Sequence, residues 1–264
     1  MRNFGLIIIA SLILSGCSLI PKQVDTTKDW SASKFYSEAK KSLSEGDFEE
    51  AIKFYEQLEA RFPFGKYAQQ AQVEIAYAYY KYDEPESALI AADRFIKLHP
   101  RHPNVDYLYY LKGLVNFNAG KDLISKYIPQ DPTQRDPGAA RASFDDFSVL
   151  VRKYPASKYS EDARQRMLYL RNNLAEYEIH VARYYMKREA YLAASNRAKY
   201  VIENYQKTTA IPKALNIMAK AYQAIGLDDL SKDAMRVLEK NYPGYQDKGT
   251  VTKVEESSWI PWKP

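Results

Sequence analysis

The sequence is poor in the residues that build catalytic and metal centres. Its 264 residues include one cysteine and three histidines. A structural zinc site needs about four Cys or His ligands at short spacing, so His99, His102 and His180 are interpreted as satisfied loop or surface histidines. The chain also lacks a phosphate-binding loop, a G-x-S-x-G elbow and an H-E-x-x-H helix. We therefore expect neither catalysis nor a bound metal or dissociable cofactor.

A strong excess of one charge is also absent. The chain carries 38 Lys and Arg against 33 Asp and Glu, a net charge of +5. Nucleic-acid binding requires a clustered basic face, and this mixed composition predicts an ordinary solvated surface instead. A single cysteine allows no internal disulfide, so an apolar core alone must hold the fold.

Long apolar runs are missing except near the start of the chain. Arg2 precedes an almost wholly apolar stretch over residues 4–14, which is too short to span a bilayer and is typical of a secretory signal. The stretch runs into the sequence LSGC, whose last residue is Cys17. This order resembles the bacterial lipobox, in which the cysteine thiol is acylated and the chain is cut just before it. A membrane-anchored signal with an incidental cysteine is the alternative.

Lipidation determines where the whole protein works. We expect a signal peptide over residues 1–16, a covalent diacylglycerol and N-acyl chain on Cys17, and a lipidated, flexible tether over residues 17–31. Several acyl chains hold a protein firmly on a membrane without spanning it. In lipoproteins an Asp after the cysteine tends to retain the protein at the inner membrane, so Ser18 implies the periplasmic face of the outer membrane.

The rest of the chain repeats itself. An aromatic residue or His, usually followed by Pro, closes successive helical patterns at intervals of 37 to 55 residues. Tetratricopeptide repeats have a period of about 34 residues and end in Pro. Small residues precede each marker, as close helix crossings require. The markers are Phe62-Pro63, His99-Pro100, Tyr154-Pro155, Tyr205-Gln206 and Tyr242-Pro243, and the small pairs are Ala39/Ala51, Ala76/Ala88, Ala182/Ala194 and Ala219/Ser231.

These patterns predict an all-α fold, a tetratricopeptide-type α-solenoid of about five helix pairs over residues 32–243. An unrelated helical bundle is the alternative, but it would not show this register. Residues 120–138 contain three prolines and predict a long loop. Residues 160–174 have apolar side chains at helical spacing and predict one extra helix inserted before the fourth pair. Residues 244–264 form a C-terminal tail.

Three segments carry a resemblance to a known family: residues 61–81 (RFPFGKYAQQAQVEIAYAYYK), 93–113 (DRFIKLHPRHPNVDYLYYLKG) and 135–159 (RDPGAARASFDDFSVLVRKYPASKY). With the lipobox and the repeats, they resemble the BamD family, also called ComL or YfiO, of outer-membrane β-barrel assembly lipoproteins. The resemblance extends to about Pro243. It implies a scaffold that binds BamA through its periplasmic POTRA domains, helps to hold the lipoprotein BamC, and contacts unfolded outer-membrane proteins. A different periplasm-facing repeat lipoprotein that docks peptidoglycan or division enzymes is the alternative.

The expected concave face is rich in aromatic residues. The first helix of each pair lines this face, and Tyr offers a large contact area, few rotors and a hydroxyl group for peptide backbone. Such a groove suits extended, aromatic-rich segments such as the terminal strands of barrel proteins. Packing between helices is the alternative for the same side chains. The candidate substrate-peptide residues are Tyr77, Tyr80, Lys81, Tyr107, Tyr110 and Phe117.

The carboxy-terminal repeats carry a second candidate surface. The resemblance places these repeats against BamA, and a cationic patch there would pair with acids on a POTRA domain. Ordinary solvated helix charge is the alternative. The candidate BamA-contact residues are Arg183, Lys187, Arg188 and Arg197.

Overall fold

The computed structural model describes residues 26–119 and 131–247, and these residues form helices without strands. Cys17 and the signal peptide lie outside the described residues. The described residues contain ten α-helices and one short 3₁₀ helix. They are α2 (Ala32–Glu45), α3 (Phe48–Arg61), α4 (Lys66–Lys81), α5 (Pro85–Leu98), α6 (Val105–Asn118), η2 (Pro132–Gln134), α8 (Gly138–Lys153), α9 (Ser160–Lys187), α10 (Tyr191–Asn204), α11 (Ile211–Ala224) and α12 (Asp228–Asn241).

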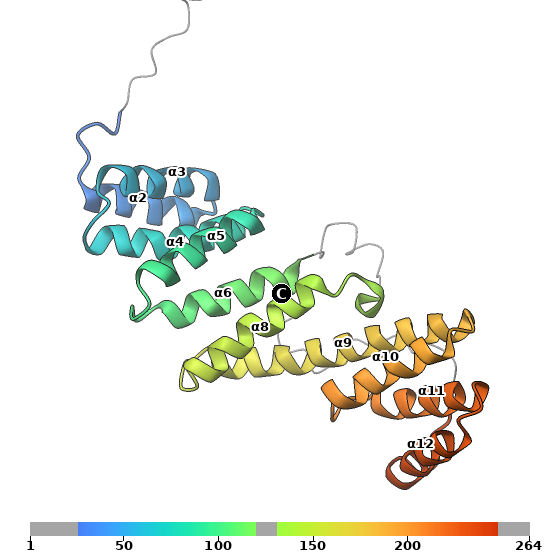
Figure 1. Ribbon diagram of the computed structural model, residues 1–264. Coiled ribbons are helices and arrows are strands. Elements are labelled where there is room, and N and C mark those ends of the chain that lie inside the picture. The colour runs from blue at the N-terminus through green and yellow to red at the C-terminus, as the bar shows by residue number, and fades with distance from the viewer. Residues whose placement is uncertain (1–25, 120–130, 248–264) are drawn as a thin grey trace, which may run out of the picture.

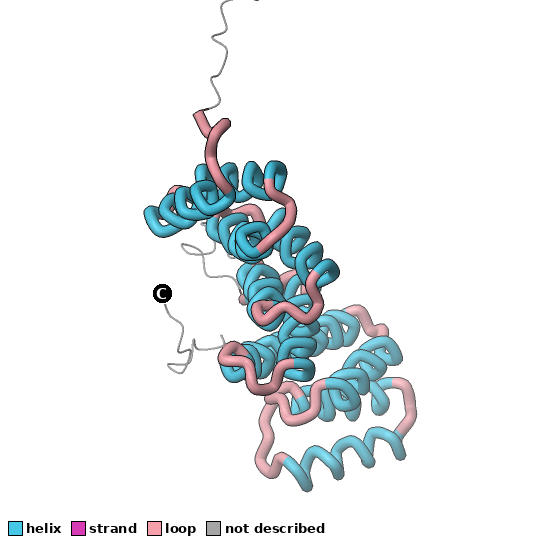
Figure 2. The backbone as a smooth tube through the Cα atoms, turned by 90° about the vertical axis from the view of Figure 1, so that its left-hand side faces the viewer, coloured by secondary structure: helices cyan, strands magenta, loops and turns pink. Residues whose placement is uncertain are grey.

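The helices pack as five consecutive pairs, which confirms the predicted α-solenoid. The pairs are α2/α3, α4/α5, α6/α8, α9/α10 and α11/α12. They stack one after another along an elongated body (Figure 1). The backbones of the first helices of successive pairs approach one another closely, whereas the second helices of the described pairs lie farther apart, with α3 and α5 joined by the Arg94–Glu59 ion pair. We call the surface of α2, α4, α6, α9 and α11 the inner face, and Figure 2 shows the same stack of helices turned by 90°.

The repeat markers are the residues that end the second helices. Phe62, His99, Tyr154, Tyr205 and Tyr242 each follow the last helical residue and donate the backbone N–H to the carbonyl four residues earlier. Four of the five markers are followed by Pro, which cannot continue a helix. In every pair, therefore, the marker residue of the sequence ends the second helix.

The predicted small residues lie at the helix crossings. Ala39, Ala51, Ala76, Ala88, Ala182, Ala194 and Ala219 are all buried. In the third pair a Cβ atom on Gly113 would lie 2.3 Å from the Phe147 ring, so no larger residue fits without movement. Ser143 donates a 2.9 Å hydrogen bond to the Gly113 carbonyl, and Ser231 does the same to Ala219 in the fifth pair.

The prediction of a separate extra helix over residues 160–174 is wrong. Those residues are the first half of α9, a continuous helix of 28 residues. No Gly or Pro interrupts the sequence after Leu174, and buried residues such as Ala175 and Ile179 continue the helical spacing. The first half of α9 packs in a core with α6 and α8, and its second half packs in a core with α10 and α11.

The expected tether also ends earlier than residue 31. Arg61 donates a 2.8 Å hydrogen bond to the Thr27 carbonyl, and Thr27 donates to the Gln57 side chain at 3.2 Å. The Trp30 ring lies 5.1 Å from the ring of Phe35 and contacts the first pair. Residues 27–30 are thus part of the folded body. None of the described helices is long and apolar enough to cross a membrane.

Candidate protein-binding surfaces

Four of the predicted groove residues come together on the inner face. Tyr77 and Tyr80 project from α4 with ring centroids 6.5 Å apart. Tyr107 and Tyr110 project from α6, and the ring of Tyr159 lies 5.5 Å and 4.8 Å from them, stacked on Tyr110. All five side chains are half-buried. We call Tyr77, Tyr80, Tyr107, Tyr110 and Tyr159 the tyrosine surface.

Two hydroxyl groups of the tyrosine surface have a raised pKa. Burial, followed by the phenols of Tyr77 and Tyr159, raises the pKa of Tyr107 above its ordinary value. Burial and the hydrogen bond to Asp162 raise the pKa of Tyr110 to about 12. Tyr110 donates that bond at 2.7 Å, and the Tyr80 hydroxyl accepts one from the Asn118 amide at 2.7 Å. The hydroxyls of Tyr107 and Tyr110 therefore stay protonated at physiological pH, and the surface offers closely packed aromatic faces.

The surface continues to a half-buried acid beside the first pair. Glu74 on α4 accepts hydrogen bonds from the hydroxyls of Tyr36 at 2.9 Å and Tyr55 at 2.8 Å, and from Lys40 at 2.8 Å. Sequence reasoning missed Tyr36, Glu74 and Tyr159. A signal existed for Tyr36, because it precedes Tyr110 by 74 residues, twice the 37-residue spacing. No such register signal exists for Tyr159, which precedes the lengthened helix.

Two of the predicted groove residues are not part of this surface. Phe117 is only 8% exposed. It packs against Phe147 and Tyr169 because α8 and α9 cover the end of α6. Lys81 is exposed, but its ammonium group lies 5.8 Å over the ring of Phe48 at the start of α3. The groove assignment is therefore wrong for the buried Phe117, whereas that of the exposed Lys81 stays a prediction.

Some residues of the predicted cationic patch form ion pairs with acids of the same chain. Arg197 on α10 pairs with Glu178 on α9 at 3.0 Å, and Arg141 on α8 pairs with the other oxygen of Glu178 at 3.0 Å. The Glu178 side chain is 1% exposed. The two arginines therefore neutralise a buried carboxylate and tie α8 and α10 to α9. Arg197 has a structural role in this position.

The other three cations lie on α9 and at its end. Arg183 pairs with Asp247 at 3.4 Å. Lys187 and Arg188 are exposed, and neither forms an ion pair with any residue in the described part of the chain. The structure thus leaves Lys187 and Arg188 open for a partner, while Arg183 and Arg197 are engaged.

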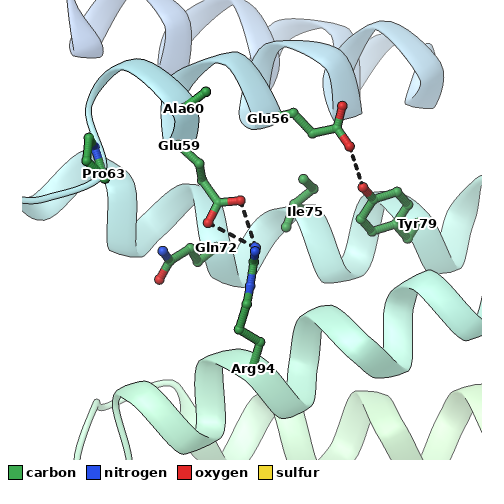
Figure 3. A pocket seen from close by; sticks show the side chains of 8 residues that line it. All are labelled: Glu56, Glu59, Ala60, Pro63, Gln72, Ile75, Tyr79 and Arg94. Carbon is green, nitrogen blue, oxygen red and sulfur yellow. Dashed lines mark hydrogen bonds and ion pairs between the residues drawn. The ribbon is translucent and has the colours of Figure 1, made fainter.

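The described residues offer small open cavities without the features of a catalytic centre. The larger has a volume of about 520 Å³ between α3, α4 and α5 (Figure 3). Its acids are already paired, since Tyr79 donates to Glu56 at 2.7 Å and Arg94 pairs with Glu59 at 2.8 Å. A second cavity of about 480 Å³ lies along α9 beside His180. Across residues 26–119 and 131–247, no three His, Cys, Asp or Glu side chains cluster as metal ligands.

The half-buried His180 has a partner, as expected for a structural histidine. Its Nε2 atom lies 2.8 Å from the hydroxyl of Thr133 in η2. Burial lowers the pKa of His180, so the ring is neutral at physiological pH. The described end of the predicted loop, residues 131–137, is thus attached to α9.

The family model and the individual relatives that match this chain point to the same family. Residues 28–238 match the model of the YfiO family, described as outer membrane lipoproteins. The chain is 45% identical over 246 residues to an outer membrane protein assembly factor BamD of Neisseria meningitidis serogroup A, covering 92% of each chain. It is 38% identical to the BamD of Vibrio cholerae, covering 89% of this chain and 96% of that one. It is 33% identical to the BamD of Haemophilus influenzae, covering 91% and 90%.

Proposed function

The chain belongs to the YfiO family of outer membrane lipoproteins and acts in the assembly of outer membrane proteins; we propose that it does so as a non-catalytic, lipid-anchored scaffold. In this proposal acyl chains on Cys17 hold it at the periplasmic face of the outer membrane. No other cofactor is needed. The inner face binds extended segments of unfolded barrel proteins, and the carboxy-terminal repeats bind BamA through its POTRA domains and help to hold BamC.

The tyrosine surface carries the substrate-binding part of the proposal. Its rings lie on two adjacent first helices and at the start of a third, so their positions are fixed before any ligand arrives. Fixed aromatic side chains lose little conformational freedom on binding. The hydroxyls of Tyr77 and Tyr107 form no hydrogen bond with any described residue, which leaves them for the backbone of an extended peptide.

A matched pair of variants tests the tyrosine surface. Tyr77→Ala removes a ring of the surface, whereas Tyr79→Ala removes a half-buried ring of the same helix that bonds to Glu56 on α3. We expect Tyr77→Ala to weaken binding of a peptide copied from the last strand of a barrel protein at least tenfold, as truncated aromatic anchors do. Tyr79→Ala should leave the affinity unchanged while lowering stability. Equal affinities for the two variants would contradict the proposal.

Lys187 and Arg188 carry the part of the proposal that concerns BamA. They are the open cations of the predicted patch, and exposed charges at a protein contact mainly set association rate and specificity. The double variant Lys187→Glu/Arg188→Glu should reduce recovery of BamA in a detergent-solubilised pull-down. Lys41→Glu/Lys97→Glu on α2 and α5 makes the same change of net charge at exposed sites of the first two pairs, away from the carboxy-terminal repeats, and serves as the control. Equal recovery with both variants would remove the end of α9 from the contact.

A further inference from the structure

The last described residues turn back across the inner face. After Tyr242, Gly244 adopts a φ of 78°, a left-handed conformation that glycine adopts readily. Tyr245 then packs against the core of the last two pairs. Asp247 reaches α9 and α11, where its carboxylate meets three donors. These are Arg183 Nη2 at 3.4 Å, Asn216 Nδ2 at 2.8 Å and Lys220 Nζ at 3.2 Å.

These donors have the properties of a built anion site. Asn216 and Lys220 lie one turn apart on α11, and Arg183 faces them from the neighbouring first helix α9. Asn216 is 8% exposed, so its amide is fixed among packed side chains and directed at the carboxylate. An amide N–H₂, a guanidinium and an ammonium group all donate hydrogen bonds, and the two cations strengthen them. The set is suited to an anion, and the anion it holds in this structure is a carboxylate.

The group that fills this site is held much less firmly than the site itself. Asp247 follows α12 by six residues, and the segment between them contacts the core through Tyr245. Partly exposed ion pairs of this kind contribute about 0–1 kcal/mol to stability. The donors, in contrast, belong to two packed helices and stay in place when the carboxylate leaves. An incoming acid can therefore replace Asp247 at little cost to the fold.

We propose that Arg183, Asn216 and Lys220 form a carboxylate-binding site for an aspartate or glutamate side chain of an extended partner segment, and that Asp247 occupies it as an intramolecular competitor. A short tether gives the competitor a millimolar effective concentration. A partner with one acid and no further contacts is therefore excluded, whereas a segment with additional contacts along the inner face displaces the tail. The site lies at the opposite end of the inner face from the tyrosine surface and does not depend on it.

The test measures binding in trans by the full mature chain. The probe is a fluorescent synthetic peptide of residues 242–250, which contains Asp247. We expect it to bind the variant Asp247→Asn about two- to fivefold more tightly than the wild-type chain, because a tail contact of up to about 1 kcal/mol competes for the site to that extent. A peptide carrying Asp247→Asn should bind neither chain. Adding Asn216→Leu or Lys220→Gln to the Asp247→Asn chain should abolish binding, whereas Lys232→Gln on α12 should not.

Each other result overturns the inference. Equal affinity of the probe for the wild-type and Asp247→Asn chains would mean that Asp247 does not occupy the site. Equal affinity of the two peptides would mean that the carboxylate is not recognised. Absence of binding to every chain would mean that the donors form no site for an acid in trans. Because Lys220 is half-exposed, Lys220→Gln tests the site even if Asn216→Leu unfolds the last pair.

Discussion

Removing both arginines from Glu178 should destabilise the protein by more than the sum of the two single changes. The Glu178 side chain is 1% exposed, whereas those of Arg141 and Arg197 are 48% and 45% exposed. An arginine that loses its partner is therefore rehydrated, but the carboxylate is not. In Arg141→Ala or Arg197→Ala the remaining arginine still neutralises Glu178.

The expected free energies follow from this asymmetry. Each single variant loses one charge-assisted hydrogen bond, which corresponds to about 1.5–3 kcal/mol. The second removal leaves a buried, unpaired carboxylate, which costs about 3–5 kcal/mol. The double variant should thus exceed the sum of the single effects by about 1.5–2 kcal/mol, within the range of couplings between contacting residues. Adding Glu178→Gln removes the buried charge and should recover most of that excess.

Urea unfolding of the mature chain, followed by circular dichroism at 222 nm, measures these differences. Arg236→Ala is the control, because it breaks a largely exposed ion pair with Asp233 on α12 and should cost at most about 0.5 kcal/mol. Additive single effects without recovery by Glu178→Gln would refute the reasoning, since they would mean that water reaches the carboxylate. The result also decides how Arg197→Glu is interpreted. This variant places two carboxylates together, so lost BamA binding by it would not identify a contact residue.

Three further outcomes are expected. Gly113→Ala should lower the free energy of unfolding by about 1–3 kcal/mol in the same urea assay, because the Phe147 ring must move to admit a Cβ atom. Cys17→Ser should leave the precursor uncut and absent from salt-washed outer membranes; its retention there would mean that protein contacts suffice. Above pH 10 the unfolded chain ionises its tyrosines while the pKa of Tyr110 stays near 12, so stability should fall between pH 10 and 12. Tyr110→Phe should reduce that fall, as pH-dependent melting temperatures would show.

The repeat architecture was predictable because the same residues face the same constraint in every pair. A close crossing of two helices excludes large side chains, so Ala76 and Ala88 recur at matching offsets. The marker residues recur because each ends a second helix at the same point of the unit. These constraints are local, and a single sequence displays them five times. They therefore define the number of pairs and their approximate boundaries.

The length of α9 was not predictable from the repeat alone. The repeat period predicts a first helix of ordinary length in the fourth pair. Residues 160–174, which lie before that helix and exceed the period, also favour a helical conformation. The choice between two helices and one depends on what lies at the junction near Leu174. Asn172 and Asn173 stand directly before this junction and are compatible with a turn, whereas no Gly or Pro lies near it. The sequence around Leu174 therefore does not decide between the two, and the packing of α9 against both neighbouring cores does.

The tyrosine surface was predicted in part because register gives the face of a helix but not what covers it. Tyr110 and Phe117 are seven residues apart and share one face of α6. Tyr110 remains half-buried, whereas Phe117 is enclosed by α8 and α9. The difference depends on the path of a helix more than forty residues later in the chain, and no local pattern contains that information.

The role of Arg197 shows what a charged residue on an apolar stripe implies. Ala175, Glu178, Ile179 and Ala182 recur at helical spacing, and all four are buried. A carboxylate on such a stripe requires cationic partners from the helices that pack against it. Its neighbours are the second helices of two successive pairs, so one arginine from each satisfies it. The apolar pattern of α9 thus predicts that the arginines near Glu178 stabilise the fold by neutralising it. Lys187 and Arg188, in contrast, can bind a partner without leaving a buried charge unpaired.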